Sequence, residues 1–96
     1  MSKREPIVHE LKSWPDSFEA VALGAKTAEF RLNDRDFRVG DKVKLRYWDP
    51  ATETYSGRFI CGRISHVAYG PSWGIPDGWC MFSMKGLIDQ TGKGIY

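Results

Sequence analysis

Apolar and polar residues alternate one by one through several short runs of this 96-residue chain. The clearest run is residues 42–48, in which Val43, Leu45 and Tyr47 alternate with basic residues. Side chains on a β-strand point to opposite faces in turn, so this pattern predicts strands with one buried face. The strands expected in this way lie at residues 7–12, 26–32, 42–48, 58–69 and 79–85.

One stretch breaks this period and predicts a helix at residues 14–24. Pro15 suits the first turn, Gly24 suits the C-terminal end, and Phe18 and Val21 fall on one helical face. With one main helix after the first strand, the remaining strands predict an α+β fold. We expect a mostly antiparallel sheet that curls into a small barrel, with the helix covering an open end.

The second half of the chain contains the expected irregularities. Within residues 58–69 the buried phase slips between Ile64 and Val67, which predicts a bulge or bend near Gly62. The next stretch, to residue 78, is rich in glycine and proline and predicts a loop that exposes Trp73. Residues 86–96 are expected to form a tail or a small hairpin.

Composition limits the class of protein. A hydrophobic content of 42% and a charged content of 27% are typical of a soluble globular domain, so we expect one domain over residues 1–96 with its core at about 7–85. The start of the chain lacks an apolar run of the kind found in signal peptides or membrane spans, which favours a cytoplasmic protein without membrane association. The net charge of +2 is too small to indicate a nucleic-acid partner by itself.

The cysteines and histidines do not predict a metal site or a disulfide. Cys61 and Cys80 lie in apolar, strand-like surroundings, so we expect two reduced thiols. Together with His9 and His66 they match none of the usual metal-ligand spacings. The sequence therefore predicts no metal, and nothing in it calls for a cofactor.

Charged residues gather on the strand that follows the helix. In the alternating residues that follow Lys26, Phe30 and Leu32 fall on the face expected to be buried. Glu29 and Arg31 fall on the opposite face. A cation, a carboxylate and a guanidinium in one short row suit a binding site. They suit equally a row of ion pairs with a structural role only.

Gly24, Lys26, Glu29 and Arg31 have the spacing G-x-K-x-x-E-x-R, which resembles the signature of the ASCH superfamily, small barrels related to the PUA RNA-binding domains. Other residues resemble a narrower family of short bacterial and phage proteins of unknown function. The further matches are residues 9–12, Phe18, 33–37, 39–41, Tyr55 and 57–58. The likeness covers about residues 7–85 and implies a PUA-like (ASCH) barrel.

This resemblance implies a cleft between the helix and the following strand that binds RNA or a nucleotide-like small molecule. Arg31, with its planar fork, and Lys26, as a point charge, suit a phosphate or carbonyl, and Glu29 suits an exocyclic amine. The residues expected to bind the ligand are Lys12, Lys26, Glu29, Arg31, Asn33, Arg35 and Trp73.

An enzymatic alternative stays open at this point. Some ASCH relatives are similar to amidohydrolases that act on acylated cytidine with an adjacent lysine and threonine and a distant glutamate. Lys26 and Thr27 match the first two, but the chain has no glutamate after Glu53, which leaves Glu29 as the candidate. Other relatives resemble metal-independent ribonucleases, for which the candidates are Lys12, Lys26, Arg31 and Tyr69.

Overall fold

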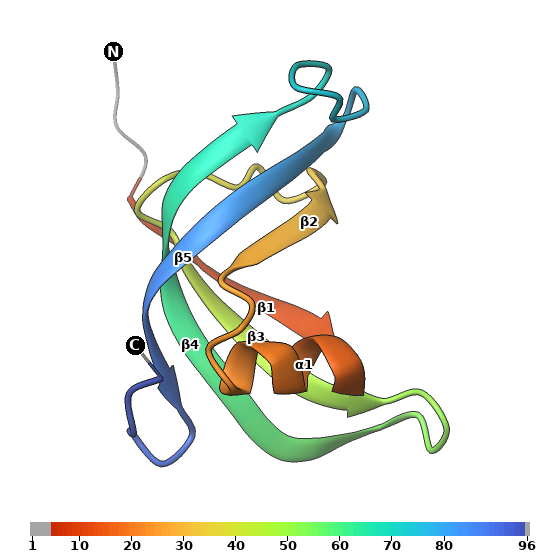
Figure 1. Cartoon of the computed structure of the whole chain (residues 1–96), viewed down its shortest axis with the longest axis vertical. Helices are drawn as coiled ribbons and strands as arrows, with labels where there is room; N and C mark the ends of the chain where they lie inside the picture. Colours follow the sequence, from red (N-terminus) through yellow and green to blue (C-terminus); the bar gives the residue numbers. More distant parts are fainter. Residues whose placement is uncertain (1–4, 96) are drawn as a thin grey trace.

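One curved sheet makes up most of the protein (Figure 1). The computed structural model describes residues 5–95. In chain order its elements are β1 (Val8–Ser13), α1 (Pro15–Ala22), β2 (Ala28–Leu32), β3 (Lys42–Asp49), β4 (Thr54–Tyr69) and β5 (Trp79–Asp89). The expected α+β class, with one main helix after the first strand, is confirmed for these residues.

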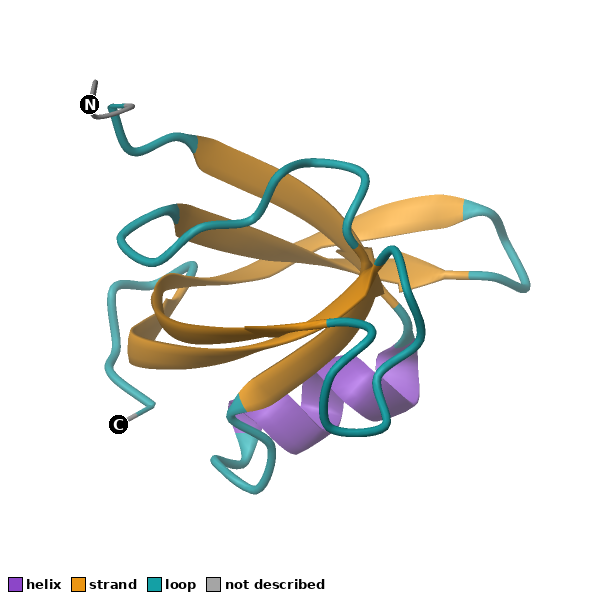
Figure 2. Cartoon of the chain, turned by 90° about the horizontal axis from the view of Figure 1, so that it is seen from above, coloured by secondary structure: helices purple, strands orange, loops and turns teal. Residues whose placement is uncertain are grey.

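The sheet is mixed, with the order β1-β3-β4-β5-β2. The first strand pairs with β3 in parallel, and the other neighbouring strands pair antiparallel. The sheet curls into a half-barrel, so its two edge strands, β1 and β2, approach each other across an open seam (Figure 2). The prediction of a curled, mostly antiparallel sheet is therefore confirmed.

The helix packs inside the curl because its apolar face meets β3. Phe18 and Val21 are buried, and the Phe18 ring meets Tyr47 edge-on at 5.2 Å between ring centroids. Pro15 occupies the start of the helix, as expected. Gly24 ends it with a φ of 77°, a left-handed conformation that glycine adopts without steric cost.

The long strand β4 bends where the sequence indicated. Its register with β5 shifts between Cys61 and Arg63 and again between Ile64 and His66. These shifts are the expected bulges, and they let one strand of 16 residues follow the curl of the sheet. Gly62 lies at the first shift, and a Cβ there would lie 2.5 Å from Leu87 Cδ2, so any larger residue would force the buried Leu87 side chain to move.

The C-terminal region is more ordered than a fraying tail. β5 continues beyond residue 85 to Asp89, and an isolated bridge joins Ile88 to Gly94. Leu87 and Ile95 are buried in the main hydrophobic cluster. The hairpin alternative is therefore the one observed, and the packed core extends past the expected limit at residue 85.

The prediction of which side of β2 is buried was wrong. Glu29 is 4% exposed, whereas Phe30 is 52% and Leu32 is 48% exposed. The alternation itself is present, but Glu29 and Arg31 pair with Phe82 and Cys80, whose side chains are buried on the inner face. β2 is an edge strand, so its inner face meets the open seam and its apolar side chains lie outside.

The cysteines are free thiols, as expected, with Cys80 buried and Cys61 partly buried. Burial raises the pKa of the Cys80 thiol.

Within residues 5–95 no helix combines the length and apolarity that a bilayer crossing demands.

Candidate functional site

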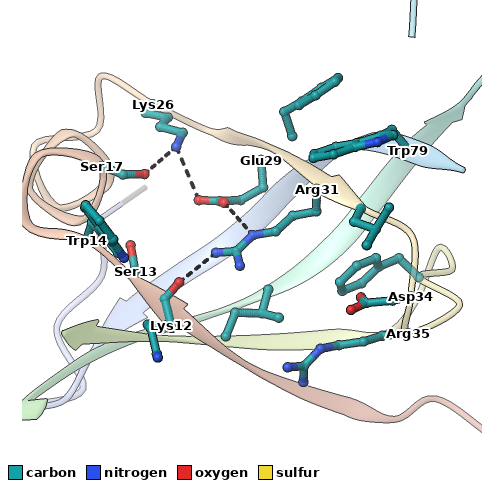
Figure 3. Close-up of a pocket in the computed structure, with 14 residues that line it drawn as sticks. Lys12, Ser13, Trp14, Ser17, Lys26, Glu29, Arg31, Asp34, Arg35 and Trp79 are labelled. Atoms are coloured by element: carbon teal, nitrogen blue, oxygen red, sulfur yellow. Dashed lines mark hydrogen bonds and ion pairs between the residues drawn. The ribbon is translucent and has the colours of Figure 1, made fainter. Parts of the chain in front are cut away.

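A cleft of about 520 Å³ lies at the seam of the half-barrel, between α1, β2 and the end of β1 (Figure 3). It contains the charged residues of the motif together with residues from the helix and the first strand. Its lining includes Lys12, Ser13, Trp14, Ser17, Lys26, Glu29, Phe30, Arg31, Asp34, Arg35 and Trp79. Its volume is in the range common for small-molecule sites.

Two arginines reach β1 across the seam, Arg31 from β2 and Arg35 from the loop that follows β2. Arg31 Nη2 donates a hydrogen bond to the backbone carbonyl of Lys12 at 3.0 Å, and Arg35 Nη1 donates to that of Glu10 at 3.0 Å. An edge strand presents backbone groups without a partner strand, and here guanidinium groups occupy two of them. The cleft is thus the part of the seam that backbone pairing leaves open.

A buried carboxylate lies between two cations on one side of the cleft. Glu29 Oε2 accepts a hydrogen bond from Arg31 Nε at 3.1 Å, and Glu29 Oε1 lies 3.4 Å from Lys26 Nζ. The Lys26 ammonium also donates to Ser17 Oγ on α1. Figure 3 shows Glu29 between Lys26 and Arg31, with the Arg31 guanidinium directed toward β1.

Two buried oxygen atoms in this cleft have no hydrogen bond within the described part of the chain. They are Glu29 Oε1 and Ser13 Oγ. The first has an ion-pair contact with Lys26 but no hydrogen bond, so part of its acceptor capacity is unused. Buried polar atoms are nearly always satisfied, so these two oxygens are free to accept hydrogen bonds from a molecule in the cleft, water included.

Aromatic side chains flank the cleft. Trp14 is 57% exposed at the start of α1, and its ring lies 6.0 Å from that of Trp48. On the opposite side Trp79 stacks on Phe30, with 5.3 Å between ring centroids and 19° between planes. Phe30 and Trp79 share the outer face of β2, opposite Glu29 and Arg31, so this aromatic pair forms the outer edge of the cleft while Trp14 lies beside its helix end.

Three expected residues lie elsewhere in the structure. Asn33 is occupied locally, because its Oδ1 accepts from the Phe37 amide at 3.0 Å. Trp73 is 88% exposed, as expected, but it belongs to the loop after β4 and does not line the cleft. Thr27, the nucleophile of the enzymatic hypothesis, is also absent from the lining.

Tyr69 is likewise distant from the chemistry proposed for it. Its hydroxyl donates to the backbone carbonyl of Phe37 at 2.6 Å, and it does not line the cleft. Burial raises the pKa of Tyr69 above its ordinary value of 10.0, so the hydroxyl keeps its proton.

Five of the seven expected ligand residues do come together in the cleft: Lys12, Lys26, Glu29, Arg31 and Arg35. Sequence reasoning missed Ser13 and Ser17. Ser13 has the same strand parity as the buried Leu11, and this signal identifies its inward side chain. Ser17 carries no comparable signal, because only the position of α1 against β2 places it beside the Lys26 ammonium.

His9 forms a buried pair outside the cleft. Its Nε2 lies 2.8 Å from Asp41 Oδ2, and its ring lies 4.7 Å from that of Phe37. Asp41 also accepts hydrogen bonds from two backbone amides, those of Ile7 and Arg38. The pair fixes the start of β1 beside the start of β3.

Among residues 5–95 no three metal-ligating side chains gather at one place.

The fold and the cleft define the class of the protein: a small α+β domain with a curled mixed sheet and a charged cleft at its seam. Residues 8–84 match the model of a family described as "Domain of unknown function (DUF3850)", and the chain belongs to this family.

A protein of Escherichia phage P2, described as "Uncharacterized 12.9 kDa protein in GpA 3'region", is 35% identical over 66 residues. The aligned region covers 69% of this chain and 59% of the phage protein. The chain therefore spans less than two thirds of this relative. The expected likeness to short phage proteins of unknown function is confirmed.

Proposed function

We propose that this protein is a PUA-like domain of the ASCH type whose cleft binds a nucleotide-like ligand, either a free nucleotide or one base of an RNA strand. The observation that carries the proposal is Glu29. Its carboxylate is buried between Lys26 and Arg31, and one oxygen lacks a hydrogen bond. The cytoplasm, where RNA and nucleotides are abundant, is the compartment that agrees with this function.

The donor and acceptor set favours a base over a phosphate as the group that lies deepest. A phosphate needs donors alone, and a buried carboxylate would repel it. A base edge offers both amine donors and carbonyl or ring-nitrogen acceptors. Glu29 Oε1 and Ser13 Oγ accept from such an edge, while Lys26 and Arg31 donate to it.

The rim then suits the rest of a nucleotide. Trp14 and Trp79 offer faces on which a base can stack, a contact that stabilises binding by about 1–3 kcal/mol per base. Lys12 and Arg35 lie at the seam, where the sugar and phosphate of a bound nucleotide would leave the cleft. Asp34 also lines the cleft beside Arg35, so the rim carries both signs of charge, with two cations and one carboxylate.

The hydrolase alternative has less support from the geometry. The amine of Lys26 contacts Ser17 and Glu29, and Thr27 does not line the cleft. An ammonium beside a buried carboxylate balances charge and donates hydrogen bonds, which is the opposite of a general base. We therefore expect acylated cytidine to remain intact when incubated with the protein at high concentration.

Calorimetric titration with the four ribonucleoside monophosphates tests the proposal. We expect measurable affinity for at least one base, and Glu29→Gln should weaken it by about tenfold or more, or roughly 1.4 kcal/mol. Glu19→Gln is the matched control, because Glu19 pairs with an arginine but is exposed on α1. Ser13→Ala, a smaller change, keeps the test valid if Glu29→Gln disturbs folding. Absence of binding at millimolar nucleotide would reject the proposal.

A further inference from the structure

A second charged surface lies on the outer face of the sheet, opposite the core. Lys42 on β3 is the register partner of Arg63 on β4, and Arg63 is the partner of Lys85 on β5. Register partners project on the same face with Cβ atoms about 4.5–5.5 Å apart. These three exposed residues therefore form one row of cations across three strands, called here the basic row.

No carboxylate of the described residues neutralises the basic row. None of its three members forms an ion pair with a carboxylate of residues 5–95, whereas other exposed cations such as Arg38 and Arg58 do. Like charges directly opposite each other destabilise a sheet. An unneutralised row of this kind attracts an anionic partner.

The sheet is also hollowed at this row. A depression of about 320 Å³ is lined by Lys42, Arg63 and Lys85, together with Gly62 and Gly86. It lies at the bulge of β4, where the register shifts between Cys61 and Arg63. The cations therefore surround a recess instead of standing on a flat surface.

Cations on aromatic rings extend from the basic row toward the cleft. Lys44 and Arg46 follow Lys42 at alternate positions of β3 and so share its face. Lys44 Nζ lies 4.3 Å from the centre of the Phe59 ring, and Arg46 Cζ lies 3.8 Å from that of Tyr55.

The last step joins this line to the cleft. Lys12 is the register partner of Arg46, its Nζ lies 4.0 Å from the centre of the Trp48 ring, and it also lines the cleft. The cations from the basic row through Lys44 and Arg46 to Lys12 thus form one line, called here the outer track. Glu10 of β1 lies within this line as the register partner of Lys44, and its Oε1 is 3.9 Å from Arg46 Nη1, so the positive charge is partly neutralised there and is strongest at the basic row.

We propose that the outer track binds the phosphate backbone of a single-stranded nucleic acid, one base of which occupies the cleft. The identity of the polymer rests on the function proposed for the cleft. The charge argues for a polyanion, and the interleaved rings argue for nucleic acid over an acidic protein, because cations combined with stacking surfaces are the usual means of holding a single strand. The protein would thus take a polymer as its ligand, with the backbone on the outer face and a base at the seam.

Fluorescence anisotropy with a labelled single-stranded RNA of about 12 nucleotides tests the outer track, since single-strand sites commonly span about 4–16 nucleotides. The variants are Arg63→Gln and the double variant Arg63→Gln/Lys85→Gln. Lys93→Gln is the matched control, because Lys93 is an exposed lysine in the C-terminal turn, where its backbone amide and carbonyl form hydrogen bonds with Asp89. The residues changed in these variants, Arg63, Lys85 and Lys93, do not line the cleft.

We expect the double variant to bind RNA more weakly and to lower the slope of log K against log salt concentration by about 0.7 for each cation removed. Lys93→Gln should retain the original slope. Binding of a mononucleotide should not change in any of these variants. Because Arg63 faces like charges, Arg63→Gln should also raise the unfolding temperature at low salt, whereas a purely structural role predicts a decrease.

Other outcomes would overturn the outer track without affecting the cleft. The first is an unchanged RNA affinity and salt slope in the double variant, with mononucleotide binding intact. The second is tighter binding of polyglutamate than of RNA at equal charge. Conversely, a double variant that loses RNA binding in a protein that binds no mononucleotide would support the track and reject the function proposed for the cleft.

Discussion

One guanidinium joins the two edges of the half-barrel: Arg31 Nη2 donates to the Lys12 carbonyl on β1 at 3.0 Å while its Nε donates to Glu29 Oε2 at 3.1 Å. The same side chain therefore holds the seam together and fixes the buried carboxylate. The stability of the half-barrel and the geometry of the cleft depend on this contact.

Arg31→Lys should lower the free energy of unfolding by about 1.5–3 kcal/mol, because hydrogen bonds to charged groups are lost and an ammonium cannot reproduce the two-sided fork. Urea unfolding followed by tryptophan fluorescence measures this. Arg38→Lys, whose exposed arginine pairs with Asp36, is the control and should leave the free energy of unfolding nearly unchanged. Equal effects of the two substitutions on the free energy of unfolding would show that the Arg31 contacts stabilise the fold no more than an exposed ion pair does.

Glu29→Gln should destabilise the fold by about 2–3 kcal/mol, because it leaves Lys26 and Arg31 without their shared counter-charge at a site that is 4% exposed. Glu19→Gln removes an exposed partner of Arg58 and should cost about 0–1 kcal/mol. Chemical denaturation of both variants gives the comparison. A Glu29 variant as stable as the Glu19 variant would show that the carboxylate is not held by its neighbours.

The buried pair of His9 and Asp41 offers a separate test of the fold. Asp41→Asn should cost about 2–4 kcal/mol, because His9 and the amides of Ile7 and Arg38 lose a charged acceptor. The control is Asp77→Asn in the exposed loop, which should be nearly neutral. Thermal unfolding compares the two. Nucleotide affinity should survive Asp41→Asn at temperatures where the protein is folded, since the pair lies outside the cleft.

The C-terminal turn should respond to acid through Asp89. Hydrogen bonds from Thr91 lower the pKa of its carboxyl below the ordinary value of 3.8, with the Lys93 amide contributing. Because the folded-state pKa is depressed, this contribution to stability is complete above pH 3.8 and is lost as the pH falls through the folded-state pKa. NMR titration should place the midpoint below 3.8, and a midpoint at or above that value would contradict the turn geometry.

The strand pattern and the helix were predictable because they depend on local periodicity. Pro15 and Gly24 delimit α1 as expected, and the phase slip after Ile64 marks a real bulge of β4. Local pattern could not decide between a tail and a hairpin at the C-terminal end. Ile95 is buried through contacts with a core that is distant in sequence, and these contacts stabilise the hairpin.

The facing of β2 was not predictable in the same way. Alternation in residues 28–32 shows that two faces differ, but hydrophobicity identifies the buried one only where a strand covers an apolar core. Here Glu29 is directed inward to a charged cleft, and Phe30 packs outside on Trp79. For the same reason the motif residues were predictable as a group, whereas Ser13 and Ser17 depend on how β1 and α1 meet β2.

The most direct measurement of the central claim is a titration of the isotopically labelled protein with a mononucleotide, followed by NMR of backbone amides and tryptophan indoles. The account predicts saturable shifts confined to the cleft, at Ser13, residues 26–31 and the indoles of Trp14 and Trp79. Shifts confined to the basic row, or none at millimolar nucleotide, would contradict it.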